Sequence, residues 1–412
     1  MTIIKDSTQR AVGGGILDGY QIAEAGTFPS EWQVKKLSEI AHELTERAGQ
    51  DSYETLSISA GIGFVNQAQK FGKELSGKQY DKYIVLHKGD FSYNKGNSTA
   101  YPQGCIYRLN NRDVAAVPNV FESFRIEEQD ADYYEQLFLS GFLNKQLYSK
   151  INRGVRDDGL LNLTGKDFYS CMVPVPPMDE QKKIAQILAQ CDKIIELKQE
   201  LIVDLYQLKK ALLRVMFPVK GHNKPEIRFP RFSDAWDRRK VKDFCSISTG
   251  KSNTQDRVDD GIYPFYVRSP IVEHSNRYLF DQEAVLTVGD GAGTGKVFHY
   301  VNGKYDLHQR VYRMFDFSEE IIAKYFYHYF SNHFYDRVMS MTAKTSVDSV
   351  RYEMIADMDI SLPKVQEQIA ISDFFDHLDN LITLYQRESE DTKKRKKALA
   401  QLLLTGIVRV NI

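Results

Sequence analysis

The chain has 412 residues, of which 42% are hydrophobic and 26% charged, and its formal net charge is −1. A chain of this length is too long for one ordinary core and predicts two or three domains. The near-neutral charge argues against a free-standing protein that holds DNA mainly by neutralising phosphates, and no apolar run reaches the length of a membrane span.

The first residues and the cysteines indicate the compartment. Residues 1–27 are polar and glycine-containing, lack a signal-peptide pattern and show no strong periodicity. The cysteines Cys105, Cys171, Cys191 and Cys245 form no CxxC pair, so neither a disulfide framework nor a metal site is expected. We therefore expect a flexible N-terminal lead and a cytoplasmic protein without membrane contact.

A first module is expected over residues 28–177. It opens at Phe28 and Trp32, and its short β-like runs alternate with a helical pattern. Strands are predicted at residues 83–86 and 105–109, and a helix at residues 132–148. Trp32 is interpreted as a core anchor.

A long helix is predicted over residues 178–217, after the prolines Pro174, Pro176 and Pro177 and with Glu180 in its first turn. Its apolar residues recur at alternating spacings of three and four, which is typical of a coiled-coil seam. They include Ile184, Ile187, Ile194, Leu201, Leu205, Leu208 and Leu212. A helix of this length is interpreted as a spacer.

A second module, residues 218–363, repeats this order. Trp236 marks its start and is also expected to be a core anchor; strands are predicted at residues 262–267, 284–288 and 296–300, and an aromatic-rich core helix at residues 319–335. A second long helix follows over residues 364–412. Its seam residues are Ile371, Phe374, Leu378, Leu381, Tyr385, Leu399 and Leu402.

The two long helices are copies of one another. A shift of 187 positions places Glu180-Gln181 on Glu367-Gln368, and twelve positions between Glu180 and Leu212 are then identical without a gap. A single helical hairpin serving as a dimerisation stalk would explain the helices alone. Two copies at equivalent positions favour two equivalent modules on a common scaffold.

The glycine-rich segment from Gly289 to Val297 could cradle a phosphate. It does not match the nucleotide-binding P-loop, which needs a glycine in place of Asp290 and a hydroxyl in place of Val297. We therefore interpret it as a loop between two strands that lies close to a ligand backbone, with Lys296 at its rim.

Several loops carry amide, hydroxyl, aromatic and basic side chains, which hydrogen-bond base edges and phosphates. The candidate DNA-binding residues are Tyr93, Asn94, Lys95, Asn97, Arg153, Arg156, Lys251, Asn253, Arg268, Lys296, Arg310, Lys344 and Thr345. His308 could read bases or be structural.

Known catalytic motifs are missing. The sequence contains no HExxH, no GxSxG and no NPPY-type motif of an amino-methyltransferase. The basic run from Lys393 to Lys397 is interpreted as a solvated helix face, with contact to DNA or a partner as the alternative. No catalytic, cofactor-binding or metal-binding residue is therefore assigned.

The duplicated modules, each closed by proline, Glu-Gln and a long helix with a Lys-Lys-Ala-Leu end, resemble the specificity subunit of type I restriction-modification systems. The most specific matches are residues 175–181 and 362–368, followed by the Gly289 loop. The resemblance implies an α+β fold with two target recognition domains in tandem, spaced by two long antiparallel coiled-coil helices. Each domain would read one half of a split DNA sequence.

The resemblance also implies the partners. These are double-stranded DNA, two modification subunits that methylate adenine with S-adenosylmethionine, and restriction subunits that use ATP and Mg. This chain would be a non-catalytic subunit without a cofactor of its own. Two alternatives remain, namely a coiled-coil scaffold without a DNA role and an enzyme that binds a nucleotide at the Gly289 loop.

Overall fold

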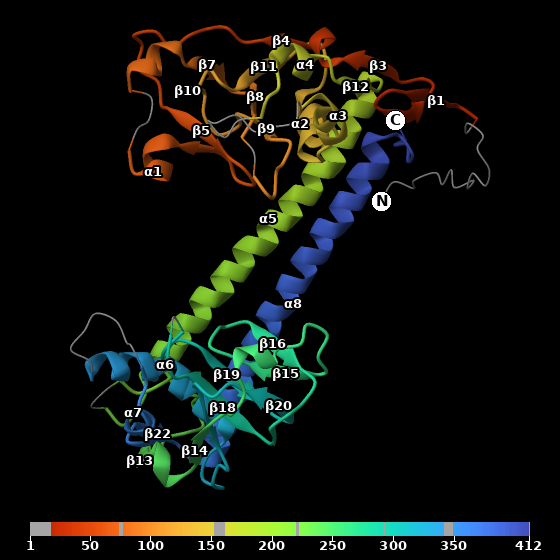
Figure 1. Cartoon of the computed structure of the whole chain (residues 1–412). Coiled ribbons are helices and arrows are strands. Elements are labelled where there is room, and N and C mark those ends of the chain that lie inside the picture. The colour runs from red at the N-terminus through yellow and green to blue at the C-terminus, as the bar shows by residue number, and fades with distance from the viewer. Residues whose placement is uncertain are drawn as a thin grey trace. The chain divides into compact units, whose positions relative to one another are not determined.

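The structure, a computed structural model, describes residues 18–73, 77–96, 98–151, 161–219, 222–291, 293–341 and 349–411 (Figure 1). The chain divides into two compact units, Met1–Leu197 with Ser389–Ile412 (unit 1) and Lys198–Glu388 (unit 2). The two long helices, α5 (Met178–Val215) and α8 (Val365–Leu404), contribute residues to both units. Among the described residues, no helix has the length and apolar character needed to cross a membrane.

Unit 1 contains a four-stranded antiparallel sheet of order β4-β11-β8-β9. These strands are β4 (Ala41–Glu43), β11 (Glu122–Ile126), β8 (Phe91–Asn94) and β9 (Cys105–Arg108). The strand pairs are β1 (Tyr20–Ala23) with β2 (Gly26–Pro29), β3 (Gln33–Lys36) with β12 (Met172–Val175), β5 (Leu56–Ser59) with β6 (Gly63–Asn66), and β7 (Ile84–His87) with β10 (Val114–Val117). The short helices are α1 (Gln67–Phe71), α2 (Ala131–Leu139), α3 (Asn144–Lys150), α4 (Gly165–Tyr169), η1 (Leu37–Glu39) and η2 (Gly77–Lys82).

Unit 2 repeats the four-stranded antiparallel sheet, with the order β14-β21-β18-β19. These strands are β14 (Ser246–Thr249), β21 (Val311–Phe315), β18 (Ala284–Val288) and β19 (Phe298–Val301). A second, mixed sheet contains β16 (Val272–Ser275), β15 (Tyr263–Tyr266), β20 (Lys304–Leu307) and β17 (Phe280–Asp281), and β13 (Asp237–Lys240) pairs with β22 (Asp359–Leu362). The remaining helices are α6 (Ala323–Ser340), α7 (Tyr352–Ala356), η3 (Val241–Asp243) and η4 (Thr254–Asp256).

The two units use one scaffold. In each, the strand that follows the tryptophan pairs with the strand that precedes the long helix, as β3 does with β12 and β13 with β22. The glutamine of each Glu-Gln pair joins the turn before α2 or α6 to the end of that strand: Gln181 accepts from the amide of Asp130 and donates to Pro176, and Gln368 accepts from Ile322 and donates to Pro363. The tandem organisation that the repeat predicted is therefore confirmed, and so is the α+β fold that the resemblance implied.

Most predicted core elements are confirmed. Trp32 and Trp236 are 1% and 3% exposed. The aromatic residues of α6 are core, since Tyr325, Phe326 and Phe330 are fully buried. The strand predictions coincide with β7, β9, β15, β18 and β19, and the first long helix matches α5 closely.

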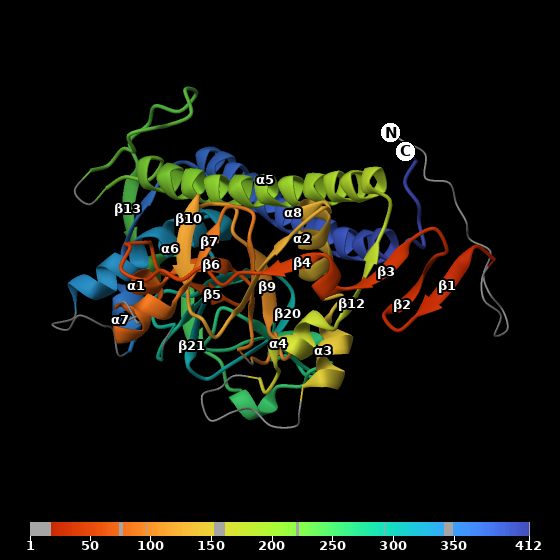
Figure 2. The same ribbon diagram turned by 90° about the horizontal axis from the view of Figure 1, so that it is seen from above.

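Four boundaries differ from the sequence prediction. The aromatic-rich helix predicted at residues 319–335 is α6, which spans Ala323–Ser340. The helix predicted at residues 132–148 is two helices, because Gly141 has a φ of +76° and turns the chain between α2 and α3. Residues 20–27 of the expected lead belong to the β1–β2 hairpin. The helix expected to reach residue 412 ends at Leu404, and the tail returns to the hairpin, where Tyr20 donates to the carbonyl of Gly406 at 3.0 Å (Figure 2).

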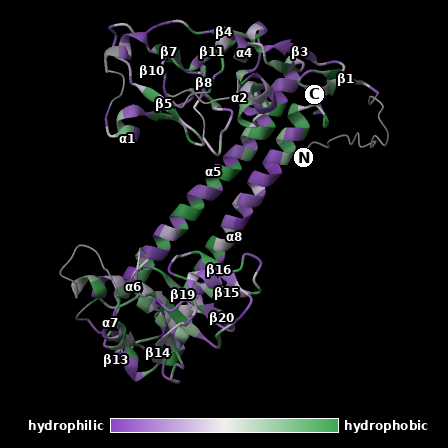
Figure 3. Ribbon diagram, in the orientation of Figure 1, coloured by the Kyte–Doolittle hydropathy of each residue, from purple (hydrophilic) through white to green (hydrophobic). Residues whose placement is uncertain are grey.

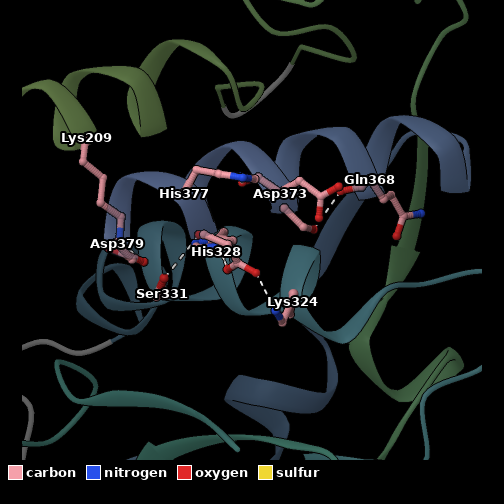
Figure 4. Close-up of polar contacts among 10 residues, drawn as sticks. Lys209, Lys324, His328, Ser331, Gln368, Asp373, His377 and Asp379 are labelled. Carbon is pink, nitrogen blue, oxygen red and sulfur yellow. Dashed lines mark hydrogen bonds and ion pairs between the residues drawn. The ribbon is translucent and has the colours of Figure 1, made fainter. Parts of the chain in front are cut away.

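Within each unit α5 and α8 run antiparallel. In unit 1, Lys396 Nζ lies 2.5 Å from the Asp192 carboxylate, and in unit 2, Lys209 Nζ lies 2.5 Å from Asp379 (Figure 4). The two ion pairs are equivalent, because the 187-residue shift converts Asp192 to Asp379 and Lys209 to Lys396. The repeat therefore extends to the contacts between the helices.

The predicted seam is wrong at several positions. Ile194, Leu201, Leu208 and Leu402 are 47%, 37%, 48% and 38% exposed, whereas Ile184, Leu205 and Ile371 are buried. The other predicted seam residues are half-buried, namely Ile187, Leu212, Phe374, Leu378, Leu381, Tyr385 and Leu399. Hydrophobic and hydrophilic residues alternate along both helices (Figure 3). Periodicity identifies residues that share a helix face, but charged pairs occupy part of the face between α5 and α8, so some of the apolar stripe remains uncovered.

Candidate nucleic-acid interface

Four loops of unit 2 meet at one edge and are called the edge loops. They are residues 250–253 after β14, 267–271 between β15 and β16, 289–291 with 293–297 between β18 and β19, and 308–310 between β20 and β21. The amide of Lys251 donates to the carbonyl of Leu307 at 3.1 Å, and the amide of Gln309 donates to Ser252 at 2.9 Å. The amide of Gly289 donates to the carbonyl of Arg310 at 2.8 Å, so the backbone itself holds the loops together.

Two glycines permit this close approach. A Cβ on Gly250 would stand 2.0 Å from the carbonyl oxygen of Leu307, and a Cβ on Gly293 would stand 3.0 Å from the carbonyl oxygen of Arg268. No larger residue fits at Gly250 without moving one of the loops.

Five of the candidate residues identified in the sequence are exposed on the edge loops. They are Lys251, Asn253, Arg268, Lys296 and Arg310. Asn253 Oδ1 accepts a hydrogen bond from the side-chain Nε2 of Gln309 at 2.5 Å. Lys296 Nζ lies 4.9 Å from the ring centroid of Tyr335. The predicted place of the glycine-rich loop, between two strands, is confirmed.

Asp290 joins two of the exposed arginines. Its Oδ1 lies 3.3 Å from Arg268 Nη1, and its Oδ2 lies 3.6 Å from Arg310 Nε. The Asp290 side chain is 26% exposed, whereas the arginines are 48% and 62% exposed. One half-buried carboxylate thus lies between two solvent-accessible guanidinium groups.

A second network lies beneath the loops and was missed by sequence reasoning. Asp306 is completely buried, and its Oδ1 accepts from Ser252 Oγ at 2.5 Å. Arg277 donates to Ser252 Oγ at 3.1 Å and to Asp256 at 2.8 Å. The hydrogen-bonded pairs of this network are 21 to 54 positions apart along the chain, so no local motif pointed to them.

His308 is a structural histidine. Its side chain is 4% exposed, and its Nδ1 accepts a hydrogen bond from the amide of Arg310 at 3.0 Å. Burial lowers the pKa of His308, and the nearby Arg268 and Arg310 lower it further. The neutral ring therefore fixes the backbone of Arg310.

The candidates in unit 1 have different surroundings. The prediction is wrong for Tyr93, which is fully buried in β8, stacks on Phe168 at 4.7 Å and donates to the carbonyl of Gln103. Burial raises the pKa of its hydroxyl. Lys95 pairs with Glu122 at 2.8 Å, and both side chains are mostly buried.

Asn94 stabilises its own loop by donating to the carbonyl of Ile58 and accepting from the amide of Gly96. The remaining candidates, Asn97, Arg153, Arg156, Lys344 and Thr345, lie outside the described residues. The β8–β9 loop of unit 1 corresponds to the glycine-rich loop of unit 2, because β8 and β18 hold the same place in their sheets.

The edge loops present hydrogen-bond donors and positive charge, which suit phosphates and base edges. The glycine-rich loop leads into strand β19 and not into a helix, so it lacks the helix N-terminus that binds phosphate in a P-loop. Among the residues that the structure describes, no group of three or more His, Cys, Asp or Glu side chains could hold a metal ion.

Comparison with known proteins places the chain in context. The family model described as the type I restriction modification DNA specificity domain matches residues 29–207 and again residues 233–393. The MjaVIII type I restriction enzyme specificity subunit of Methanocaldococcus jannaschii is 28% identical over 302 residues, which cover 66% of this chain and 70% of the relative. The putative MjaX specificity subunit of the same organism is 23% identical, and the match covers 95% of this chain and 97% of the MjaX chain.

Solved structures share the fold. The type I restriction-modification S subunit from M. genitalium has a TM-score of 0.58 at 14% identity, and the match covers 92% of this chain and 96% of that S subunit. A chain from a study of complex assembly and conformational transition of the type I R-M system has a TM-score of 0.57 at 15% identity, with 92% and 99% coverage.

Proposed function

The chain belongs to the type I restriction modification DNA specificity family, and we propose that each of its two units reads one half of a split DNA target. The observation that carries this proposal is the duplication: two family matches, two copies of one four-stranded sheet and two long helices. A single site would not require a second scaffold with different loops.

The edge loops of unit 2 supply the chemistry of recognition. Lys251, Lys296 and the two arginines suit phosphates and guanine edges, while Asn253 and Gln309 can pair with adenine. The corresponding loops of unit 1 differ in sequence. Different loops on one scaffold favour two different half-site sequences.

Partner subunits supply the chemistry of modification in this proposal. Two modification subunits methylate adenine with S-adenosylmethionine, and restriction subunits use ATP and Mg. This chain performs no catalytic step. The exposed apolar residues of the long helices support protein partners, because Ile194 and Leu197 in unit 1 and Leu201 and Leu208 in unit 2 remain 37% or more exposed.

The helices also serve as a ruler in this account. Lengthening α5 and α8 by the same number of turns should widen the gap between the half-sites that the complex accepts. An unchanged gap would contradict the ruler.

The test is adenine-methylation mapping in cells that carry the modification subunits, with and without this chain. We expect one split motif to be methylated only when the chain is present. An identical methylation pattern in both strains would contradict the specificity role and favour a scaffold without DNA recognition.

A further inference from the structure

The exposed arginine at the end of the last edge loop has the geometry of a base reader. The backbone of Arg310 is held on both sides, because its amide donates to His308 Nδ1 at 3.0 Å and its carbonyl accepts from Gly289 at 2.8 Å. Its side chain is 62% exposed. A rigid backbone with an exposed head is the arrangement that direct base recognition needs.

The guanidinium of Arg310 lies beside Asp290. Its Nε is 3.6 Å from Asp290 Oδ2, which is an ion-pair distance. Within the part of the chain that the structure describes, the Arg310 guanidinium donates no hydrogen bond to another protein group and has this ion pair beside it. Two parallel N–H donors match O6 and N7 of guanine in the major groove, which is the commonest specific contact of arginine with DNA.

Arg268 is the second ligand of Asp290. Its Nη1 donates a hydrogen bond to Asp290 Oδ1 at 3.3 Å, so one of its terminal nitrogens already has a protein partner. This arrangement leaves Asp290 anchored on one side and available to orient Arg310 on the other. The difference between the two arginines assigns base reading to Arg310 and support to Arg268.

We infer that Arg310 reads a guanine in the half-site of unit 2 and that Asp290 is a positioning residue for its guanidinium. This inference rests on the proposed DNA-reading function of the units and names one recognised base. A planar, orientated guanidinium discriminates guanine by about 10- to 100-fold, whereas a lysine at the same place supplies charge without the bidentate geometry.

The test uses the complex of the full chain with its modification subunits. Its probes are double-stranded oligonucleotides that carry the mapped split target, with each position of each half replaced in turn by the other bases. Relative methylation rates are measured for the unaltered protein and for Arg310→Ala, Arg310→Lys, Asp290→Asn and Asp290→Glu. The matched control is Asp357→Asn, which removes an exposed carboxylate paired with Lys242 at 2.7 Å, outside the edge loops.

We expect Arg310→Ala and Arg310→Lys to lose the roughly 10- to 100-fold preference for guanine at one position, with the other positions unchanged. Asp290→Asn should weaken the same preference for guanine without lowering the methylation rate on the targets that are methylated most slowly. Asp290→Glu should keep part of the preference that Asp290→Asn loses. Asp357→Asn should leave the preference intact.

Two results would overturn the inference while leaving the proposed function standing. One is an unchanged base preference at every position in both Arg310 variants. The other is a half-site, assigned to unit 2, that has no guanine on either strand. If the unaltered complex methylates all targets equally, the proposed function itself fails.

Discussion

Arg409 and Glu180 are joined by two hydrogen bonds, from Nε to Oε1 at 2.6 Å and from Nη2 to Oε2 at 2.9 Å, although 229 positions separate them along the chain. Glu180 is completely buried and also accepts a hydrogen bond from Trp32 Nε1 at 2.9 Å. Arg409, in the tail that follows α8, therefore pairs with Glu180 in the first turn of α5. The tail after α8 and the segment that carries Trp32 thus meet at Glu180 in unit 1.

Replacing Arg409 with methionine should destabilise unit 1. The change leaves a buried carboxylate without its cation, which costs about 3 kcal/mol, the lower end of the usual range because the Arg409 side chain is 32% exposed. Hydrogen exchange should show faster opening of unit 1. The double variant Arg409→Met with Glu180→Gln should be more stable than Arg409→Met alone, and equal or lower stability would contradict this account.

The equivalent change in unit 2 is Arg228→Met. Arg228 follows α5 and forms two hydrogen bonds of 2.6 Å with Glu367, which is 1% exposed and opens α8. We expect a similar cost of about 3 kcal/mol, detected by hydrogen exchange in the second sheet and α6. Faster exchange confined to unit 1 would show that the two contacts are not equivalent.

Lys251 and Lys296 should contribute to DNA affinity without changing the sequence that is read. Each phosphate contact that is lost lowers the slope of log affinity against log salt by about 0.9. Binding of the methylating complex to its target, measured at several salt concentrations, should show this decrease for Lys251→Ala and for Lys296→Ala. If both variants keep the slope of the unaltered protein, these lysines do not contact phosphates. Lys242→Ala serves as the control.

The stability of unit 2 should decrease as the pH falls below about 6.5. Burial lowers the pKa of His299, His308 and His333, so the unfolded state binds protons that the folded state excludes. The stabilisation is present above the ordinary histidine pKa and is lost at lower pH, by at most about 1.4 kcal/mol per pH unit for each histidine. Hydrogen exchange in unit 2 at about pH 7.5 and pH 5, corrected for intrinsic rates, tests this. The variant His333→Phe should show a smaller pH dependence.

The sequence predicted the scaffold well because the scaffold is duplicated. The matched tryptophans, Glu-Gln pairs and long helices carry side chains that pack or hydrogen-bond in both units, so the pattern occurs twice. Tyr93 illustrates the limit. Its polar neighbours suggested a loop, whereas β8 is an inner strand of its sheet and buries that side chain.

The contacts of the site could be predicted only in part. The exposed residues of the edge loops were identified by side-chain chemistry, but the role of Asp290 depends on three loops that the sheet order brings together. Similarly, the spacing of Leu201 and Leu208 identified a stripe but not which molecule covers it. These relationships arise from tertiary structure and leave no local pattern.

A chimera tests most directly whether each unit reads its own half-site. Residues 237–362 are replaced by the corresponding segment of a relative with a different target, and adenine methylation is then mapped. We predict that one half of the split motif changes, while the other half and the gap remain the same. A motif that changes in both halves, or in neither, would contradict the account.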